Sequence, residues 1–316
     1  MRIVFFGTPD FAVVSLNALV EAGCDVCLVV TTPDKPVGRH QNHLQPSPVK
    51  TYALEHGLPL VQPADLSDPG FVSLLGQVSP DVGMVVAFRK LPREVWSLPR
   101  RGTFNVHGSL LPLYRGAAPI NWAIINGEKE TGVTTFMLDD RIDTGGVLLS
   151  RSLAIGDDDT FGEVYERLSL IGAELALDTL KGIEEGTLRP TPQAEPDPER
   201  SRAPKLNRDN TRIDWARSPR EIHNFVRGLS PTPAAWTLLE GEGLQSQQLK
   251  VFRTRVRPVE HQLPVGMLVA ETRDALSVAV EGGFVDILEL QVAGKKRMAA
   301  ADLLRGHQSI LELIVK

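Results

Sequence analysis

The segment Arg2-Ile-Val-Phe-Phe-Gly7 decides the fold of the first part of the chain. It is a short apolar run, rich in β-branched and aromatic residues, which predicts a buried strand. Apolar residues then recur at helical spacing over residues 11–22, and Gly23 is a residue type that commonly ends a helix. Residues 25–32 form a second apolar run of the strand type. A strand, a helix and a strand in this order predict a right-handed crossover between parallel strands.

The alternation of strands and helices continues outward from this unit to residue 186. Further strands are predicted at residues 58–61, 82–88, 103–107, 132–138 and 146–150, and helices at residues 49–56, 70–78, 117–125 and 160–186. This pattern is typical of a doubly wound, mostly parallel α/β sheet, which we assign to residues 1–189. Sheets of this kind bind their ligands beyond the carboxyl ends of the strands, so the catalytic groups are expected there.

A different pattern follows a proline-rich stretch. The prolines between residues 190 and 204 predict an extended linker, which we assign to residues 190–206. A helix is predicted over residues 213–228, and strands over residues 235–239, 249–256, 266–271, 275–280 and 285–292. Short strands separated by glycine turns favour a small, OB-like β-barrel for residues 207–316.

Composition and charge limit the class of protein. The chain has 316 residues, of which 42% are hydrophobic and 23% charged, so it is typical of globular proteins. Its net charge of −5 argues against nucleic-acid binding by the chain as a whole, but the balance is −8 over residues 1–203 and +3 over residues 204–316. The apolar runs are shorter than the roughly 18 residues of a membrane helix, and the start of the chain does not resemble a signal peptide. We therefore expect a cytoplasmic protein with no membrane partner.

Several common cofactor and catalytic motifs are missing from the sequence. The turn Gly7-Thr-Pro-Asp10 has only the first glycine of a dinucleotide-binding loop, and Pro9 removes an amide donor, so NAD and FAD are disfavoured. No Walker A loop follows a strand, and no Gly-x-Ser-x-Gly elbow is present. The seven histidines are scattered along the sequence, so no metal site is predicted.

The stretch from Asn105 to Pro119 is the most informative for chemistry. Asn105 and His107 occupy one face of a predicted strand, near its carboxyl end, because strand side chains alternate between faces. Asp143 lies in an acidic loop after a later strand. An amide, an imidazole and a carboxylate would then meet at neighbouring strand ends. Two explanations remain open at this point: the three side chains are catalytic, or they only satisfy backbone groups of the loops.

These residues carry a resemblance to a known family. Asn105-x-His107, the run Ser109–Pro112 and the later Asp143-Thr-Gly145 are similar to the motifs of the folate-dependent formyltransferases. Residues 6–12, 33–39, 46–50, 212–215, 221–223 and 288–298 resemble further stretches of the methionyl-tRNA formyltransferases within that group. The matching stretches follow the family's order over almost the whole chain, which makes the resemblance specific.

The resemblance implies a reaction and a cosubstrate. Methionyl-tRNA formyltransferases move the formyl group of N10-formyltetrahydrofolate to the amino group of methionyl initiator tRNA, so folate and tRNA are the expected partners, with no metal. In this translation-initiation reaction, negative charge develops on the formyl oxygen and needs hydrogen-bond donors. The implied catalytic residues are Asn105 and His107 as donors, and Asp143, which favours the protonated imidazole and accepts the amine proton.

The resemblance also implies binding residues. Folate would lie against Ser109, Leu110, Leu111 and Pro112, with Phe88, Leu91 and Asp140 completing its pocket. Pro9 and Phe11 are candidates for contact with the methionine side chain, and Arg39, Lys295, Lys296 and Arg297 for contact with the tRNA. An apolar turn suits a flat pterin ring, whereas cations suit phosphates. We expect the enzyme to be a monomer.

The chain departs from the family pattern in three places, and three other functions stay open. Phe88-Arg89 replaces the usual Tyr-Gly beside the pterin pocket, Gly108 replaces the usual Ala between His107 and Ser109, and residues 38–43 hold one fixed positive charge where the family is lysine-rich. A sugar-nucleotide N-formyltransferase would use the same three side chains. A hydrolase would let water replace the amine, and a folate- or RNA-binding protein would bind without transfer. Assays with both amine acceptors separate these alternatives.

Overall fold

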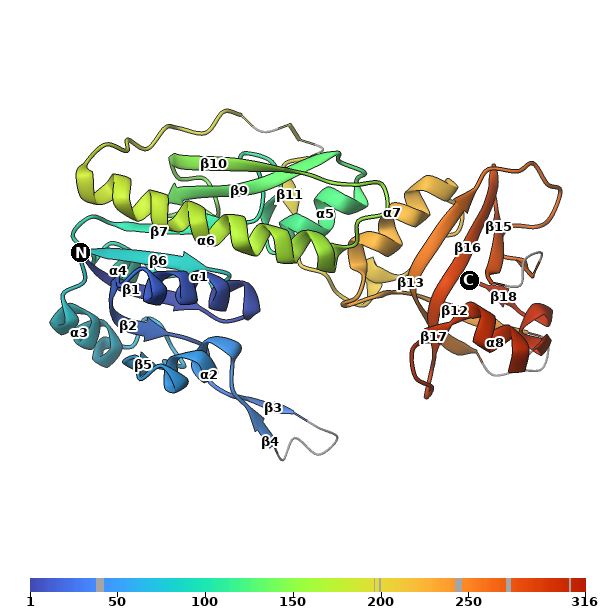
Figure 1. The fold of residues 1–316 in the computed structure, drawn as a ribbon, viewed down its shortest axis with the longest axis horizontal. Coiled ribbons are helices and arrows are strands. Elements are labelled where there is room, and N and C mark those ends of the chain that lie inside the picture. Colours follow the sequence, from blue (N-terminus) through green and yellow to red (C-terminus); the bar gives the residue numbers. More distant parts are fainter. Residues whose placement is uncertain (38–42, 196, 199, 242–245, 271–273, 307) are drawn as a thin grey trace. The chain divides into compact units, whose positions relative to one another are not determined.

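The computed structural model describes residues 1–37, 43–195, 197–198, 200–241, 246–270, 274–306 and 308–316 (Figure 1). These residues divide into two compact units. Unit 1 comprises Met1–Pro119, Thr131–Leu153 and Tyr165–Arg202, and unit 2 comprises Ile120–Glu130, Ala154–Val164 and Ala203–Lys316. Two short segments that are flanked in the sequence by unit 1 therefore belong to the second unit. Over the described ranges, no helix combines the length and apolar character needed to cross a bilayer.

A seven-stranded sheet forms the centre of unit 1. Its strands, in spatial order, are β10 (Val147–Ala154), β9 (Glu130–Met137), β7 (Thr103–His107), β6 (Val82–Val86), β1 (Arg2–Gly7), β2 (Asp25–Val30) and β5 (Leu60–Val61). The pairs β5–β2, β2–β1, β1–β6 and β6–β7 are parallel, whereas β9 runs antiparallel to β7. The predicted doubly wound, mostly parallel sheet is confirmed. Its strand order reverses between β1 and β6, the kind of position where such sheets bind ligands.

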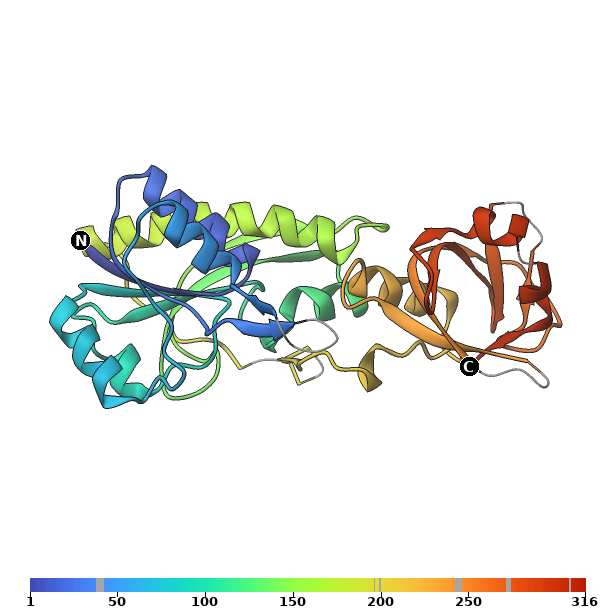
Figure 2. The same cartoon turned by 90° about the horizontal axis from the view of Figure 1, so that it is seen from below.

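Helices cover both faces of this sheet. The remaining elements of this part of the chain are α1 (Asp10–Glu21), α2 (Pro48–Glu55), α3 (Pro69–Val78), α4 (Arg93–Trp96), α6 (Phe161–Glu185), the pair β3 (Lys35–Val37) and β4 (His43–Gln45), and the pair β8 (Arg115–Gly116) and β11 (Arg202–Ala203). Figure 2 shows α1 and α6 on one face and α3 with α4 on the other. Alternating side chains explain this arrangement. Phe6 and Val85 pack in one core with Phe71 of α3, while Val106 lies against Gly172 of α6.

Unit 2 is built around an antiparallel sheet that nearly closes into a barrel. Its strand order is β14 (Leu268–Val269), β15 (Leu276–Val280), β16 (Gly283–Val292), β13 (Gln247–Arg257), β12 (Ala235–Glu240) and β18 (Ile314–Val315), and β17 (Met298–Ala299) pairs with β16. A bridge between Met267 and Ile314 links the β14 and β18 ends. The other elements are α5 (Pro119–Ile125), α7 (Pro219–Leu229), α8 (Ala300–Gly306) and the 3-10 helices η1 (Asp209–Thr211) and η2 (Gln308–Glu312). The predicted barrel is confirmed, and the sequence pattern missed the two-residue strands β17 and β18.

Helix α7 begins later than the sequence pattern predicts. The pattern predicts a helix from Ile213, but α7 starts at Pro219. The Ser218 hydroxyl accepts from the Glu221 amide, and the Glu221 carboxylate accepts from the Ser218 amide, so this capping box fixes the first turn. Ile213 and Trp215 are instead buried in the barrel core. The spacing of apolar residues could not distinguish burial in a loop from burial in a helix.

His223 of α7 joins the barrel to the segment that precedes α6. Its Nε2 donates to the Asp157 carbonyl at 3.1 Å, because a carbonyl can only accept, and its Nδ1 then accepts from the Thr254 hydroxyl at 3.0 Å. Burial lowers the pKa of His223, and the charge of Arg227 lowers it further. His223 is therefore a neutral structural residue of unit 2.

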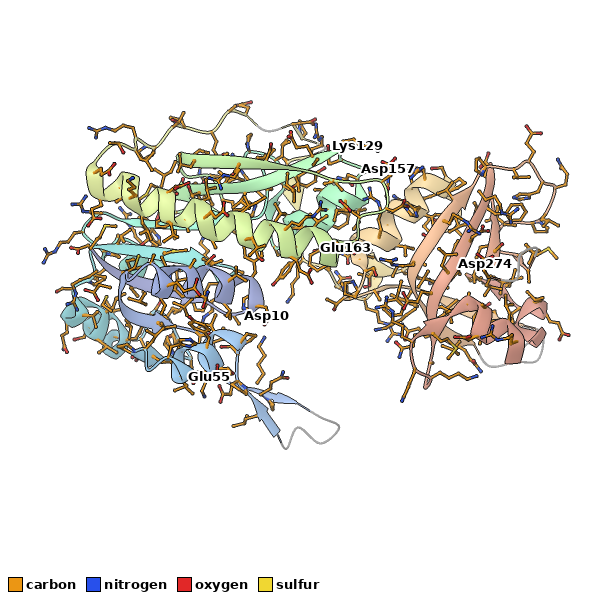
Figure 3. All side chains as sticks on the ribbon, in the orientation of Figure 1. Asp10, Glu55, Lys129, Asp157, Glu163 and Asp274 are labelled. Carbon is orange, nitrogen blue, oxygen red and sulfur yellow. The ribbon has the colours of Figure 1, made fainter. Side chains whose placement is uncertain are left out.

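Arg227 of α7 holds the same segment. Its buried guanidinium donates to the carbonyls of Gly156 and Asp159 at 3.0 Å each. Lys129 and Asp157 add an ion pair at the surface (Figure 3). Residues 154–164 are thus tied to α7, which explains why they belong to unit 2 although they lie far from it in the sequence.

Candidate active site

Strand β7 brings Asn105 and His107 to one face of the sheet of unit 1. Asn105 pairs with Val85 of β6 and Phe136 of β9, so it stands in the middle of the sheet. Its side chain is half-buried, and among the described residues its buried Oδ1 atom has no hydrogen-bond partner. A buried polar atom without a partner costs about 1–3 kcal/mol. An orphaned amide oxygen near the end of a central strand therefore points to a ligand that supplies the missing donor.

The His107 ring is buried, and its two nitrogens face different partners. Nε2 lies 3.0 Å from the Tyr114 carbonyl oxygen, which can only accept, so Nε2 carries a hydrogen. Nδ1 faces Asp143, whose Oδ2 is 3.9 Å away. This distance is too long for a hydrogen bond but short enough for a substantial Coulomb interaction. Nδ1 is therefore the nitrogen of His107 that is available to a substrate atom.

The loop after β9 brings Asp143 to His107. Asp143 has a φ of 54°, in the left-handed region that Asp tolerates better than most residues. Its Oδ2 accepts from the Gly116 amide at 2.8 Å. Gly145 leaves no room for a side chain, because a Cβ there would lie 1.7 Å from the Met137 carbonyl oxygen. Among the described side chains, no group of three or more His, Cys, Asp or Glu converges as metal ligands would.

The turn after β7 is held by hydroxyl groups. The Ser109 side chain is fully buried and donates within the turn, to the Leu113 carbonyl at 2.7 Å. The Thr134 hydroxyl of β9 accepts from the Leu111 amide at 3.1 Å and donates to the Ser109 carbonyl at 2.7 Å. The apolar side chains that follow, Leu110, Leu111 and Pro112, are half-buried. The turn therefore offers a preformed apolar surface beside His107.

The other residues assigned to folate lie on separate elements. Phe88, just after β6, is half-buried, and the Arg89 guanidinium lies 5.8 Å from the centre of its ring. Leu91 is 4% exposed and packs in the core beneath α3 and α4, as Phe88 does in part. Asp140 is exposed in the loop before Asp143, with its carboxylate 3.9 Å from Arg93. Phe88 and Asp140 are accessible to a ligand, whereas Leu91 is buried in the core against which Phe88 packs.

Pro9 and Phe11 lie at the N-terminus of α1. Pro9 is the N-cap residue, and Phe11 is 5% exposed. The Phe11 amide donates to the Tyr165 hydroxyl at 2.9 Å, and the two rings meet edge to face with centres 5.3 Å apart. Burial raises the pKa of Tyr165. Phe11 therefore has a packing partner of its own, whereas Pro9 is half-exposed.

The candidate tRNA-binding cations differ in their surroundings. Arg39 lies outside the described residues. Lys295 and Lys296 are exposed in the turn after β16. Arg297 forms a two-pronged ion pair with Glu289, at 2.6 and 2.5 Å, and stacks over the Phe252 ring at 4.2 Å. The charge of Arg297 is therefore already neutralised within unit 2.

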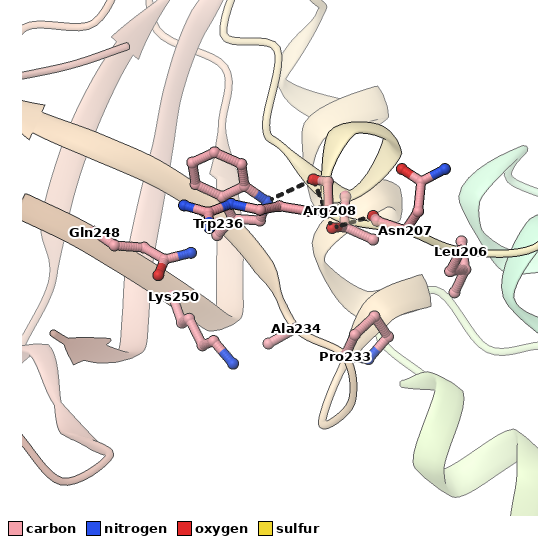
Figure 4. Close-up of a pocket in the computed structure, with 9 residues that line it drawn as sticks. Leu206, Asn207, Arg208, Pro233, Ala234, Trp236, Gln248 and Lys250 are labelled. Carbon is pink, nitrogen blue, oxygen red and sulfur yellow. Dashed lines mark hydrogen bonds between the residues drawn. The ribbon is translucent and has the colours of Figure 1, made fainter. Parts of the chain in front are cut away.

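A cavity in unit 2 gathers cations that no sequence motif brings together (Figure 4). It has a volume of about 280 Å³ and is lined by Leu206, Asn207, Arg208, Thr211, Pro233, Ala234, Trp236, Gln248 and Lys250. The guanidinium groups of Arg208 and Arg212 lie 5.2 and 5.6 Å from the centre of the Trp236 ring. Within the described part of the chain, no carboxylate is at ion-pair distance from Arg208, Arg212 or Lys250. The only signal in the sequence was the basic character of residues 204–316.

Comparisons with known proteins identify the family of the chain. A family model described as formyl transferase matches residues 1–180, and one described as formyl transferase, C-terminal domain, matches residues 205–308. The chain therefore belongs to the formyl transferase family. It is 49% identical to a methionyl-tRNA formyltransferase of Parabacteroides distasonis, over 100% of this chain and 98% of that protein. A methionyl-tRNA formyltransferase of Flavobacterium johnsoniae is 45% identical over 97% and 96% of the two chains. The predicted resemblance to this group is confirmed.

Two solved structures share the fold at low sequence identity. An N-formyltransferase from Helicobacter canadensis, in complex with folinic acid and dTDP-3-aminofucose, has a TM-score of 0.65 at 19% identity, over 91% of this chain and 98% of that one. HypX from Aquifex aeolicus in complex with tetrahydrofolic acid has a TM-score of 0.64 at 21% identity, over 96% and 47%. These likenesses concern the fold and agree with the formyltransferase architecture.

Proposed function

We propose that the chain transfers the formyl group of N10-formyltetrahydrofolate to the amino group of methionyl initiator tRNA. Its full-length relatives are named for the formylation of methionyl-tRNA. The single observation that supports this chemistry at the site is that Asp143 Oδ2 lies 3.9 Å from His107, on the strand that also presents the orphaned Oδ1 of Asn105. Acyl transfer to an amine needs donors for an oxyanion and an acceptor for a proton, and these three groups supply both.

Asn105 suits the tetrahedral stage of the transfer. The methionyl nitrogen forms a bond to the formyl carbon, the bond from that carbon to N10 breaks, and a proton passes from the amine to N10. At the tetrahedral stage the oxyanion and the amine nitrogen are bonded to the same carbon. A carboxamide presents a donor and an acceptor on one carbon, so Asn105 Nδ2 donates to the oxyanion while Oδ1 accepts from the amine. This assignment accounts for the missing protein partner of Oδ1.

His107 and Asp143 are assigned to the charge of the oxyanion and to the proton of the amine. Because the Tyr114 carbonyl accepts from Nε2, Nδ1 is the nitrogen of His107 that is assigned to the formyl oxygen. Asp143, whose Oδ2 lies 3.9 Å from Nδ1, accepts the amine proton, directly or through a water molecule. The Gly116 amide holds the carboxylate in place at 2.8 Å. Both side chains are therefore oriented before the substrates bind.

The folate cosubstrate is assigned to the turn after β7. Leu110, Leu111 and Pro112 offer a half-buried apolar surface for the pterin, with Phe88 and Asp140 as flanking contacts. The Ser109 hydroxyl is already bonded within the turn, so its backbone is the part assigned to the ligand. Leu91 acts by supporting Phe88 from the core.

The tRNA is assigned to Arg39 and to cations of unit 2. Binding to phosphates releases counterions, so such contacts weaken as salt rises. The assigned side chains in unit 2 are Lys295, Lys296, Arg208, Arg212 and Lys250. Arg39 remains an assigned contact on the loop of residues 34–47, and Arg297 has a smaller role because Glu289 neutralises it. Pro9 and Phe11 are assigned to the methionine side chain.

Incubation with labelled N10-formyltetrahydrofolate and methionyl initiator tRNA tests this function. We expect labelled formylmethionyl-tRNA. A dTDP-linked amino sugar and water serve as competing acceptors in parallel reactions. Transfer to the amino sugar alone, release of formate without an acceptor, or binding without transfer would each replace the proposal with the corresponding alternative.

We propose further that the enzyme works in the cytoplasm as a monomer, with residues 1–189 and 207–316 as its two domains. A sedimentation mass near 34.6 kDa is expected at assay concentrations. A mass twice as large would contradict the monomer.

A further inference from the structure

We infer that Gln193, in the segment after α6, is a positioning residue for Asp143, and that Arg115 fixes Gln193 in that role. The inference rests on the proposed function, because it assumes that Asp143 acts in the formyl transfer. Gln193 lies 50 residues beyond Asp143 and 78 beyond Arg115. No motif in the sequence singles it out, and only the fold of unit 1 brings these three residues together.

The Gln193 side chain is held at both of its polar ends. Nε2 donates to the carbonyl oxygens of Asp143 at 3.0 Å and Gly145 at 2.8 Å. Oε1 accepts from Nε of Arg115 at 3.1 Å and from a terminal nitrogen of the same guanidinium. Carbonyls only accept and a guanidinium only donates, so one orientation of the amide satisfies all four contacts. Position 193 therefore requires a neutral side chain of the length of Gln that carries both a hydrogen-bond donor and an acceptor.

These contacts fall on the turn that aims the Asp143 carboxylate. With a φ of 54°, Asp143 occupies a backbone conformation that a non-glycine residue keeps only when its surroundings hold it. Gln193 bridges the carbonyls on either side of Thr144 and so clamps this turn. With the backbone clamped, Oδ2 accepts from the Gly116 amide and stays 3.9 Å from His107 Nδ1.

Residues 114–116 connect the clamp to both members of the catalytic pair. The Tyr114 carbonyl accepts from His107, the Arg115 side chain holds Gln193, and the amide of residue 116 holds the Asp143 carboxylate. The backbone of residues 114–116 is itself fixed, because β8 pairs with β11 and the amide of residue 114 donates to the carbonyl of residue 200 at 2.8 Å, just before that pair. Removal of Gln193 therefore loosens the Asp143 side of the network and leaves the His107 side intact.

A residue that only stabilises the fold would behave differently. Its loss would lower the melting temperature, and any loss of turnover would be the same whether or not the Asp143 carboxylate is present. A positioning residue lowers kcat only when the group that it positions is present. The two roles are separated by measuring kcat in two backgrounds at a temperature where every variant is folded.

The test is a double-mutant cycle between Gln193 and Asp143. Gln193→Ala should lower kcat about 10–100-fold, with KM for both substrates changed less than about threefold. In the Asp143→Asn background, followed by single-turnover formation of formylmethionyl-tRNA, the same substitution should lower the rate less than about twofold. Gln193→Glu should behave like Gln193→Ala, because its carboxylate still meets Arg115 but cannot donate to two carbonyls. Gln77→Ala, at an exposed glutamine of α3, is the matched control and should keep the parent kcat.

A second cycle does not depend on residual activity of the Asp143 variant. Arg115→Ala should reproduce the kcat loss of Gln193→Ala, and the double variant should be no worse than about twofold below either single one.

The outcomes separate this inference from the proposed function. The positioning role is overturned if Gln193→Ala keeps the parent kcat. It is also overturned if, in either cycle, the fold loss of kcat in the double variant equals the product of the two single losses. Both outcomes leave the proposed function intact. Near-normal turnover in Asp143→Asn overturns the catalytic role of Asp143, and the positioning role falls with it.

Discussion

The two units of this protein hold the polar groups that we propose as functional in opposite ways. In unit 1, backbone groups of residues 114 and 116 fix both His107 and Asp143. In unit 2, no carboxylate of the described residues lies at ion-pair distance from Arg208, Arg212 or Lys250, and Glu240 interacts with Arg212 only at longer range. Fixed dipoles stabilise a transition state because they need no reorganisation, whereas unpaired cations attract phosphates at a distance and adapt to them. The contrast teaches that changes in unit 1 should alter turnover, and changes in unit 2 should alter tRNA affinity and its salt dependence.

A second contrast lies within unit 2 itself. The fully buried Asp286 carboxylate accepts from Arg255, Arg257 and Ser277, and its hydrogen bond raises the pKa of Arg255. These arginines stabilise the barrel, whereas Arg208 lines a cavity. Positive charge alone therefore does not identify a tRNA contact.

The largest expected effect concerns the proposed catalytic group. Asn105→Ala, His107→Ala and Asp143→Ala should each lower kcat by about 10³-fold or more, since each removes a donor or charge aimed at the transition state. KM for both substrates and the melting temperature should change little. Steady-state kinetics and thermal melts provide the check. Near-normal turnover in any two of these variants would contradict the assignment of catalysis to unit 1.

The next largest effect concerns the stability of the barrel. Asp286→Ala should lower the free energy of unfolding by about 2–4 kcal/mol, because it removes the shared acceptor of the buried Ser277 hydroxyl and of two partly exposed arginines. Urea unfolding followed by circular dichroism measures this change. Asp274→Ala, which removes an exposed partner of Arg255 at 3.5 Å, is the control and should cost less than about 1 kcal/mol. Equal costs would remove the distinction between structural and binding arginines.

A smaller effect is expected at the cavity in unit 2. The double variant Arg208→Ala/Arg212→Ala should raise KM for methionyl-tRNA about tenfold at unchanged kcat. The slope of log affinity against log salt concentration should become less steep, by the amount that corresponds to about one to two phosphate contacts. Arg297→Ala serves as the comparison and should raise KM less than about twofold, because Glu289 already neutralises Arg297. If Arg297→Ala has the larger effect, the tRNA contact belongs to the turn after β16 instead.

His223 should give unit 2 a pH dependence in the mildly acidic range. Burial lowers the pKa of His223 below its ordinary 6.5, so the folded state stays neutral while the unfolded state takes up a proton. This contribution to stability is complete above about pH 6.5. It is lost as the pH falls from there toward the lowered pKa. Over that range the free energy of unfolding falls by up to about 1.4 kcal/mol per pH unit. Asp158, Arg220 and Arg227 are the charged groups that also act on this imidazole.

His223→Gln should therefore lose less stability than the parent between pH 7 and pH 5 in urea unfolding. His56→Gln, at an exposed histidine of unit 1, is the control and should keep the parent's pH dependence. A His223→Gln curve parallel to the parent curve would mean that the pKa of His223 is the same in the folded and unfolded states, which contradicts the prediction.

The smallest effect is expected for Arg39. Arg39→Ala should raise KM for methionyl-tRNA about two- to threefold and leave KM for folate unchanged, since one phosphate contact is lost. Initial rates at low and high salt measure both constants. An unchanged KM for the tRNA would confine the tRNA-binding cations to unit 2.

The sequence by itself determined the strand and helix periods, and with them most of the fold. The alternation in residues 1–186 predicted the parallel sheet, and five short apolar runs predicted the barrel. It also placed Asn105 and His107 on one strand face, because their spacing of two residues is a local property. The start of α7 was predicted too early, since burial of Ile213 and Trp215 in the barrel imitates a helical pattern.

Only the tertiary structure decided which groups meet. The 3.9 Å separation of His107 and Asp143, the clamp of Gln193 on the Asp143 turn, and the approach of Arg208 to Trp236 all join residues from distant parts of the chain. It also decided which charges are already paired, as Glu289 neutralises Arg297. The physical reason is the distance along the chain over which each property is determined. Periodicity is local and fixes the face on which a side chain lies. The partners of that side chain depend on the paths of the loops, and these paths depend on the packing of the whole unit.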